Sequence, residues 1–309
     1  MAVTAEAVKQ LRERTGAGMM ECKKALVDTG GDLDAAAELM RKSGLAKADK
    51  KAARVAAEGV VVIERSADAK RAVIVEINCE TDFVARENDF KTFAANVAKA
   101  ALAQRPATMD ALLALPIGTG SSIDEARRAM IAKIGENIGV RRFAIVEAPA
   151  VVGAYLHGSR IGALVAMKTG DEAVAKDVAM HVAAINPPSL NAADIPADLL
   201  AKEQEIQMEQ TRRDPKIAGK PDAMVAKIVE GKLRKWINEN TLLGQPFVKD
   251  DKQTVENYLK QAHGEVAGFT RYEVGAGIEK KQEDFAEEVR KTVASTQAPP
   301  DGSNGKSPG

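Results

Sequence analysis

The sequence predicts an α+β protein with a three-helix module, two related antiparallel sheet-plus-helix subdomains, a helical hairpin inserted in the second, and a C-terminal helix. Three observations predict this class. Residues 4–44 carry apolar residues at helical spacing, with glycines where helices end. From Gly59 onward, β-branched runs typical of strands alternate with amphipathic segments. The order strand, strand, helix, strand then occurs a second time after residue 148.

The first 44 residues are predicted to form a small bundle of three helices. The segments TAEAVKQLRERTG, MMECKKALVDTGG and DLDAAAELMRKSG each have an apolar face, and we expect them to end at Gly16, at Gly30–Gly31 and at Gly44. The next segment, AKADKKAARVAAEG, is rich in Lys and Ala. We interpret it as a solvated linker that could be helical.

The first sheet-and-helix copy begins with two β-branched runs, GVVVIE and RAVIVEIN. They are separated by RSADAK, which predicts a β-hairpin. Residues 88–103 place Phe90 and Val97 at helical spacing and predict a helix. The run VRRFAIV at 140–146 predicts the closing strand. The intervening GTGSS at 118–122 lacks the Lys-Ser/Thr of a phosphate-binding loop, so we interpret it as a linker.

The second copy has the same order of elements. VVGAYLHGSRIGALVAM predicts a hairpin that turns at 158–160, and DEAVAKDVAMHVAAINPP predicts a helix ended by Pro187 and Pro188. The segment GFTRYEVG predicts the closing strand of this copy. We therefore expect two small antiparallel sheets, each covered by a helix.

Comparison of the two copies reveals an insertion in the first. Val75 and Val97 are 22 positions apart, whereas the equivalent residues Val165 and Val182 are 17 apart. About five additional residues therefore lie between strand and helix in the first copy, in the segment CETDFVAREND.

The second copy has its own insertion, and the chain ends in a polar tail. Residues 196–240 predict two helices with narrow apolar faces around the turn DPKIAGKP, as in a projecting antiparallel hairpin. The expected parts of the chain are a three-helix module 1–45, a linker 46–58, a first core subdomain 59–147, a second core subdomain 148–276 with its hairpin 196–240, a C-terminal amphipathic helix module 277–294 and a disordered tail 295–309.

Composition restricts the class of function. Lys plus Arg and Asp plus Glu both number 44, so the formal net charge is zero, which argues against nucleic-acid binding as the main function. No apolar run reaches the length of a membrane span, and we expect no membrane partner. The absence of a signal-like N-terminus and the use of only two cysteines, Cys22 and Cys79, favour a cytoplasmic protein.

Motifs for catalysis are missing from the sequence. The histidines His157, His181 and His263 and the two cysteines form no cluster with the spacing of metal ligands. His181 interrupts an apolar helix and is expected in the core. We therefore expect no catalytic residue, no metal and no cofactor.

Two longer motifs carry a family resemblance. LRERTGAGMMECKKAL (11–26) and EINCETDFVAR (76–86) closely resemble the two signature segments of bacterial elongation factor Ts. KIGENIGVRR, HGSRIG, GQPFV and GFTRYEVGAGIEK continue the resemblance in family order over residues 1–290. The resemblance implies a ubiquitin-associated-like helical module and a core of two related subdomains. It also implies that the chain exchanges guanine nucleotides on elongation factor Tu, the GTPase that carries aminoacyl-tRNA to the ribosome.

The resemblance assigns a role to the inserted segment. It implies that Thr81, Asp82, Phe83 and Val84 insert into the GTPase domain of the partner, near its nucleotide-bound Mg²⁺. Without the resemblance, a Phe that follows a strand is more often part of the core. With it, we expect Phe83 to be the wedge, Asp82 to accept hydrogen bonds from the partner, and Thr81 to cap the turn that presents both.

Further contacts with the partner are implied at Arg12, Met19 and Met20 of the helical module, at His157, and at Phe247 and Val248. Both methionines could instead fill the bundle core, although their adjacency requires at least one of them to be exposed. His157 is implied near the nucleotide, and the alternative is a turn residue without a role.

The implied partner is elongation factor Tu in its GDP-bound and nucleotide-free forms, together with the GDP or GTP and the Mg²⁺ that it holds. Whether the complex is one-to-one or a dimer of heterodimers stays open. The alternative function is a ribosome- or RNA-associated adaptor, against which zero net charge and 4% aromatic residues count. A small-molecule enzyme would need a convergent polar pocket that the sequence does not indicate.

Overall fold

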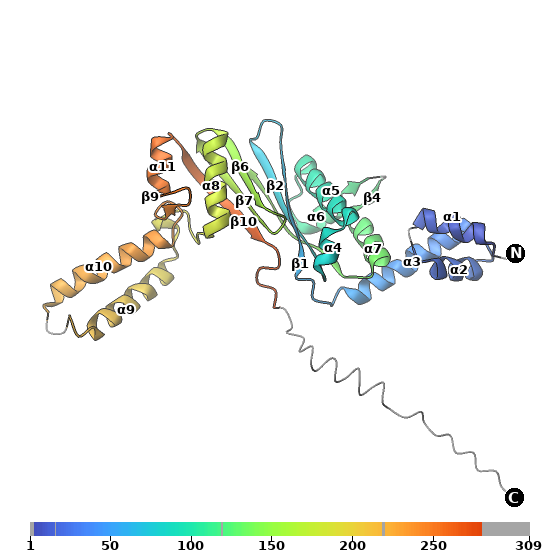
Figure 1. Ribbon diagram of the computed structural model, residues 1–309, viewed down its shortest axis with the longest axis horizontal. Coiled ribbons are helices and arrows are strands. Elements are labelled where there is room, and N and C mark those ends of the chain that lie inside the picture. The colour runs from blue at the N-terminus through green and yellow to red at the C-terminus, as the bar shows by residue number, and fades with distance from the viewer. Residues whose placement is uncertain (1–2, 16, 119, 218–219, 280–309) are drawn as a thin grey trace, which may run out of the picture. The chain divides into compact units, whose positions relative to one another are not determined.

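The computed structural model describes residues 3–15, 17–118, 120–217 and 220–279 and, for 44–50, the backbone. Its N-terminal helices are α1 (Ala5–Thr15), α2 (Met19–Asp28) and α3 (Leu33–Lys51) (Figure 1). Leu11, Cys22 and Leu26 are fully buried in the core that these helices share. The predicted three-helix bundle is therefore confirmed.

The third helix corrects one expectation. It does not stop at Gly44 but continues to Lys51, so the first residues of the expected linker 46–58 are helical. A single Gly inside a helix costs only about 1 kcal/mol relative to Ala. The sequence after it, LAKADKK, consists mainly of good helix formers, which offset that cost.

The first sheet contains β1 (Glu58–Arg65), β2 (Arg71–Cys79) and β5 (Ile138–Glu147), all antiparallel, in the order β1-β2-β5. A short helix, α4 (Asp82–Arg86), follows β2, and α5 (Asn88–Gln104) follows α4. The hairpin, the helix and the closing strand of the first copy are confirmed.

The segment between α5 and β5 contains more helices and strands than the sequence predicted. It contains α6 (Met109–Ala114), two short strands, β3 (Pro116–Ile117) and β4 (Ser121–Ser122), and α7 (Ile123–Ile134). The expected linker 118–122 therefore includes a strand, and its last residue, Ser122, caps α7 in a capping box with Glu125. The Ser-x-x-Glu spacing was a readable signal that the sequence analysis missed.

The second sheet repeats the first. It contains β6 (Val151–His157), β7 (Ile161–Thr169) and β10 (Glu265–Glu273), again antiparallel, with β7 in the middle. Helix α8 (Glu172–Ile185) follows β7 as α5 follows β2. In both copies the central strand is thus the second in chain order, which confirms the predicted repeat.

The two sheets pack face to face, and helices cover their outer faces (Figure 1). Successive residues of a strand point to opposite sides. Val60 therefore packs under the helices of the first copy, whereas Val61 packs between the sheets against residues such as Leu164. Burial on both faces explains why the strands are almost continuously apolar.

A buried carboxylate joins the two sheets. Glu76 on β2 is fully buried, and its carboxylate accepts hydrogen bonds from Arg141 (3.0 Å) and Arg142 (2.6 Å) on β5. It also accepts from the side chain of Asn78 (3.1 Å) and from the backbone N–H of Gly275 (2.8 Å), which follows β10. The negative charge is therefore compensated by donors from two strands, β2 and β5, and from the segment after β10.

A β-bulge allows two consecutive arginines to reach one carboxylate. Glu76 pairs with Arg142, but the next residue, Ile77, pairs with Val140, so Arg141 is the additional residue of β5. In a regular strand, neighbouring side chains point to opposite faces. The bulge brings both guanidinium groups to the face between the sheets.

The insertion in the second copy is the expected antiparallel hairpin, formed by α9 (Ala197–Arg213) and α10 (Asp222–Glu239) (Figure 1). A 3₁₀ turn, η1 (Ala192–Asp194), precedes it; β8 (Pro246–Phe247), β9 (Asp250–Thr254) and α11 (Val255–Gln261) follow. Most of the expected helix 277–294 and all of the tail lie outside the described residues. Within the described part of the chain, no helix is both long and apolar enough to span a membrane.

Candidate functional site

The candidate site is α4 and the residues that hold it. In the first copy, residues 80–87, eight positions, separate β2 from α5; in the second copy only 170–171, two positions, separate β7 from α8. The insertion inferred from the sequence is therefore real, and α4 occupies it.

Thr81 begins α4 as its N-cap. Its backbone is extended (φ −118°, ψ 155°), and its hydroxyl accepts a hydrogen bond from the backbone N–H of Val84 (3.4 Å). The hydroxyl donates in turn to Oε1 of Glu136 (2.7 Å), and the N–H of Thr81 donates to Oε2 of the same carboxylate (3.0 Å). The expected cap is present, and Glu136 supports it.

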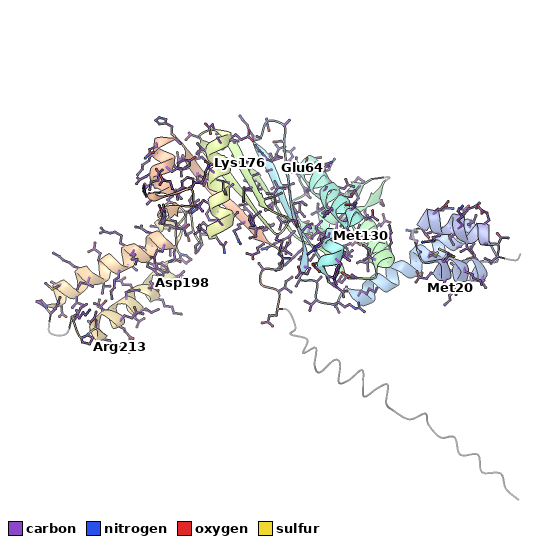
Figure 2. The ribbon with its side chains drawn as sticks, viewed as in Figure 1. Met20, Glu64, Met130, Lys176, Asp198 and Arg213 are labelled. Carbon is purple, nitrogen blue, oxygen red and sulfur yellow. The ribbon has the colours of Figure 1, made fainter. Side chains whose placement is uncertain are left out.

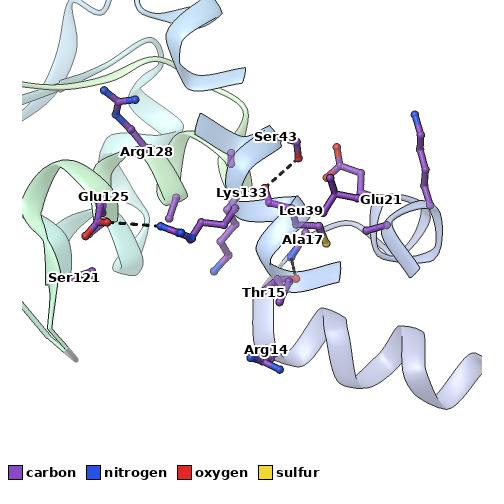
Figure 3. Close-up of a pocket in the computed structure, with 18 of the residues that line it drawn as sticks. Arg14, Thr15, Ala17, Glu21, Leu39, Ser43, Ser121, Glu125, Arg128 and Lys133 are labelled. Atoms are coloured by element: carbon purple, nitrogen blue, oxygen red, sulfur yellow. Dashed lines mark hydrogen bonds and ion pairs between the residues drawn. The ribbon is translucent and has the colours of Figure 1, made fainter. Parts of the chain in front are cut away.

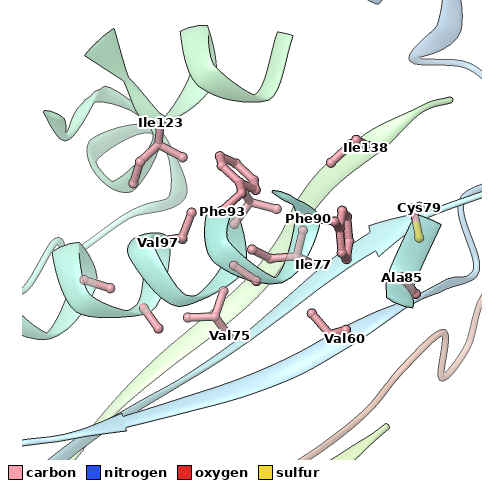
Figure 4. Close-up of a cluster of buried hydrophobic side chains, with 14 of the residues drawn as sticks. Val60, Val75, Ile77, Cys79, Ala85, Phe90, Phe93, Val97, Ile123 and Ile138 are labelled. Atoms are coloured by element: carbon pink, nitrogen blue, oxygen red, sulfur yellow. The ribbon is translucent and has the colours of Figure 1, made fainter. Parts of the chain in front are cut away.

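The inner face of α4 belongs to the core of the first copy. Val84 and Ala85 are buried in a cluster that includes Phe90 and Cys79 (Figure 4). The thiol of Cys79 donates to the carbonyl of Thr81 at 3.1 Å. Burial, together with nearby carboxylates, raises the pKa of the Cys79 thiol to about 12, so this buried group is a thiol at neutral pH.

The outer face of α4 is exposed. The side chain of Phe83 is 76% exposed. Asp82 forms an ion pair with Arg86 one turn later, at 2.7 Å, and keeps about half of its side chain in solvent (46%). Of the four residues expected to enter the partner, Asp82 and Phe83 face outward, whereas Thr81 is half-buried and Val84 packs inside this chain.

The turn after β6 lies at the same end of the first sheet as α4. The carbonyl of Ser159 accepts a hydrogen bond from the N–H of Val61 (2.8 Å), and Arg160 pairs with Glu58 (2.6 Å). Glu58 is opposite Cys79, two residues before Thr81, in the strand register. The exposed His157, at the start of this turn, is thus brought towards the end of the sheet that carries α4.

The helical module exposes all three residues expected to contact a partner. Met19 and Met20 are 60% and 76% exposed, and Arg12 is exposed on α1. Met20 lies on the outside of α2 (Figure 2). The alternative in which both methionines fill the bundle core is wrong for this chain.

Phe247 and Val248 differ from each other. Phe247 is 3% exposed and stacks on Tyr258 with ring centroids 4.2 Å apart, whereas Val248 is 43% exposed. His181 is fully buried, as expected; its Nδ1 accepts from the N–H of Val248 (3.2 Å), so its Nε2 carries the proton donated to Gln245 (2.9 Å). Of Phe247 and Val248, only Val248 is exposed enough to contact a partner.

A hollow lies between the helices of the helical module and α7 (Figure 3). It has a volume of about 760 Å³, and its lining carries charges of both signs. Arg14 pairs with Asp34 (2.5 Å), and Lys133 pairs with Asp89 (2.7 Å). These two cations of the lining are therefore already neutralised by carboxylates of this chain.

The sequence did not indicate Glu136 or Glu76, which hold α4 and the two sheets in place. Both lie in segments that the resemblance covered, KIGENIGVRR and EINCETDFVAR, but neither has a spacing that indicates its contacts. Among the described residues, no group of three or more His, Cys, Asp or Glu side chains could hold a metal ion.

Aromatic and methionine side chains that are exposed on helices whose inner faces are buried are typical of surfaces that bind other proteins. The family model described as "Elongation factor TS" matches residues 80–276. Elongation factor Ts of Alkalilimnicola ehrlichii is 56% identical over 290 residues, which cover 94% of this chain and 98% of that protein. The proteins of the same name from Halorhodospira halophila (54% identical; 95% and 99% covered) and Hydrogenovibrio crunogenus (51%; 96% and 100%) are similar throughout.

The chain therefore belongs to the elongation factor Ts family. Membership supports a role as a translation elongation factor and implies that elongation factor Tu is its partner.

Proposed function

We propose that this chain binds elongation factor Tu in its GDP-bound form, in the cytoplasm, and accelerates GDP release by inserting the outer face of α4 beside the nucleotide. Phe83 is the wedge, and the carboxylate of Asp82 accepts hydrogen bonds from partner groups that the wedge displaces. The observation that carries this proposal is the 76% exposure of a large aromatic ring on a helix whose inner residues are buried.

The chemistry of the nucleotide site explains how a wedge could release GDP. In such GTPases, Mg²⁺ bridges phosphate oxygens and a hydroxyl of the phosphate-binding loop. Mg²⁺ requires nearly octahedral coordination at short distances, so a small shift of its supporting residues weakens its binding. Without the cation, the diphosphate loses its main counter-charge and dissociates faster.

The proposed action makes and breaks no covalent bond. The chain binds nucleotide-free elongation factor Tu more tightly than the nucleotide-bound form, and by linkage the nucleotide weakens the binding of this chain by the same factor. GTP or GDP then displaces the chain. In this scheme, the partner holds both the nucleotide and the Mg²⁺.

Secondary contacts would orient the complex. Met19 and Met20 suit an adaptable apolar contact with the GTPase domain, and Arg12 lies on the same module. His157 is proposed to approach the phosphate-binding loop, because its turn lies at the α4 end of the first sheet. Val248 is proposed to touch a second domain of the partner.

The area of Phe83 sets the expected size of the effect. Burying a whole Phe side chain contributes about 1.5–3 kcal/mol. Since 76% of this side chain is exposed in the free chain, its burial in the partner would contribute about 1–2 kcal/mol. That energy corresponds to a factor of about 5 to 30 in the rate constant for exchange at limiting concentrations.

Stopped-flow release of a fluorescent GDP analogue from elongation factor Tu tests this proposal. Phe83→Ala is expected to lower the exchange efficiency by that factor, and high Mg²⁺ is expected to slow release by either form of the chain. Ile185→Ala, which truncates another apolar side chain that is 46% exposed, serves as the matched control. An unchanged rate with folded Phe83→Ala would reject the wedge. Salt-sensitive RNA binding without any effect on GDP release would instead favour the adaptor function.

A further inference from the structure

Helix α4 is too short to be stable by itself. It has five residues, and isolated helices of fewer than about 12 residues are marginal in water. Phe83 contributes little packing within this chain because it is 76% exposed. The conformation of α4 therefore depends on contacts with other elements.

Glu136 supplies the polar contact at the start of α4. Both oxygens of its carboxylate accept hydrogen bonds from Thr81, one from the N–H (3.0 Å) and one from the hydroxyl (2.7 Å). Because the hydroxyl proton points to Glu136, the hydroxyl oxygen is free to accept the N–H of Val84 (3.4 Å). The carboxylate thus fixes both the backbone and the rotamer of the residue that caps α4.

Glu136 lies in a loop that is itself held on both sides. This 135–137 loop follows α7, and the carbonyl of Gly135 accepts a hydrogen bond from Lys51 at the end of α3. The side chain of Asn137 donates to the backbone carbonyl of Arg54, between α3 and β1, at 2.8 Å. The position of Glu136 is therefore set by elements other than α4.

We propose that Glu136 is a positioning residue for nucleotide exchange: it holds α4 in the conformation that presents Phe83 and Asp82 to the partner. This inference rests on the proposed function. Glu136 itself does not touch the partner in this scheme. It acts by removing conformational freedom from residues 80–86 before binding, so that the partner need not order them.

The proposal distinguishes positioning from general stability. Residues Val84 and Ala85 are anchored in the core by apolar contacts, so α4 stays near the sheet when the carboxylate is removed. What is lost is the fixed direction of the exposed ring. Glu136→Ala is therefore expected to reduce exchange much more than it reduces global stability.

The first measurement is GDP release from elongation factor Tu with the full-length chain. Because Glu136 acts through the presentation of Phe83 in this scheme, Glu136→Ala is expected to lower the exchange efficiency by no more than Phe83→Ala does, about 5- to 30-fold. Glu136→Gln, which keeps one acceptor oxygen, is expected to be intermediate. Asp89→Ala is the matched control, because Asp89 also bridges two elements of this subdomain, but its partner is Lys133, at 2.7 Å, and not Thr81.

A double-mutant cycle shows whether Glu136 acts through Phe83. If it does, Glu136→Ala has little further effect in a Phe83→Ala background. Equal losses in both backgrounds would overturn the inference, because they would indicate an effect on the whole fold or on another contact.

Hydrogen exchange in the free chain gives a readout that does not depend on activity. Glu136→Ala is expected to increase the exchange rates of the backbone amides of residues 81–86, while those of β2 and α5 remain protected. Unchanged protection of 81–86 would overturn the positioning role.

The two proposals fail in different ways. If Phe83→Ala exchanges nucleotide as fast as the natural chain, the wedge is rejected and the inference is rejected with it. If Phe83→Ala is slow but Glu136→Ala matches Asp89→Ala, the wedge survives and only the positioning role is rejected.

Discussion

Glu76 offers the sharpest test of how the two sheets are held together. Burial by itself would raise the pKa of this carboxyl group, but hydrogen bonds from Gly275, Asn78 and the two arginines outweigh burial and hold its pKa below the ordinary value. The perturbation we consider is Glu76→Gln, which keeps the size of the side chain and removes its charge.

The contacts give the expected magnitude. Breaking a buried ion pair by neutralising one partner costs about 3–5 kcal/mol. The side chains of Arg141 and Arg142 are 27% and 34% exposed. Water can therefore solvate part of the positive charge that Glu76→Gln leaves without a carboxylate partner. We therefore expect Glu76→Gln to lower the free energy of unfolding by about 2–4 kcal/mol. For a chain of this size, this predicts a fall in Tm of about 4–16 °C.

Urea denaturation measures this change without adding salt that would screen the charges. Glu147→Gln is the matched control: Glu147 pairs with Arg71 across the same two strands, at 2.5 Å, but is 57% exposed. Exposed pairs contribute about 0–1 kcal/mol, so the control should lose little. Equal losses in the two variants, or a loss below about 0.5 kcal/mol for Glu76→Gln, would refute the argument from burial.

The pH dependence gives a second check on Glu76. Its folded-state pKa is lowered, so its contribution is fully present above the pKa of an unfolded Glu, about 4.3, and disappears as pH falls through the folded value. The difference in unfolding free energy between the natural chain and Glu76→Gln should therefore stay constant above about pH 4.3 and shrink as pH falls below that value.

Two further predictions concern the second copy. Burial lowers the pKa of His181, so the unfolded chain binds the proton first and the free energy of unfolding should fall as pH drops below about 6.5. This slope should be smaller in His181→Gln, and an equal slope in that variant would contradict the reasoning. A Cβ added to Gly153 would lie 2.2 Å from the carbonyl oxygen of Ala175, so Gly153→Ala should force β6 and α8 apart. We expect this variant to lower the free energy of unfolding, measured by urea denaturation, by about 1–3 kcal/mol. Gly231→Ala, in a helix with nothing within 4 Å, should instead stabilise by up to about 1 kcal/mol, and a fall there would contradict the reasoning.

Much of the fold was predictable because periodicity is a local property. Alternation and β-branched runs indicated the strands of both copies, and the different spacing of Val75–Val97 and Val165–Val182 indicated the insertion that became α4. The prediction was wrong at Gly44, where helix-forming residues on both sides outweigh the cost of one Gly.

The candidate site was predictable only in part. The motif around Phe83 and the family resemblance indicated the segment, but an aromatic residue after a strand is compatible with a core or a surface position. Which of Phe83, Val84 and Phe247 is exposed depends on the elements that cover each one. Val84 and Phe247 are buried and Phe83 is exposed, although all three are apolar residues in short elements, α4 and β8.

The sequence by itself determined the alternation of strands and helices, the duplication and the position of the inserted segment, because each follows from residue spacing within a few turns or strands. Only the tertiary structure decided that Glu136 supports Thr81 from 55 residues away and that Glu76 binds a residue 199 positions later. Such contacts have no period in the sequence. They depend on the packing of two sheets, which brings distant polar groups within hydrogen-bonding distance after the apolar faces have been buried.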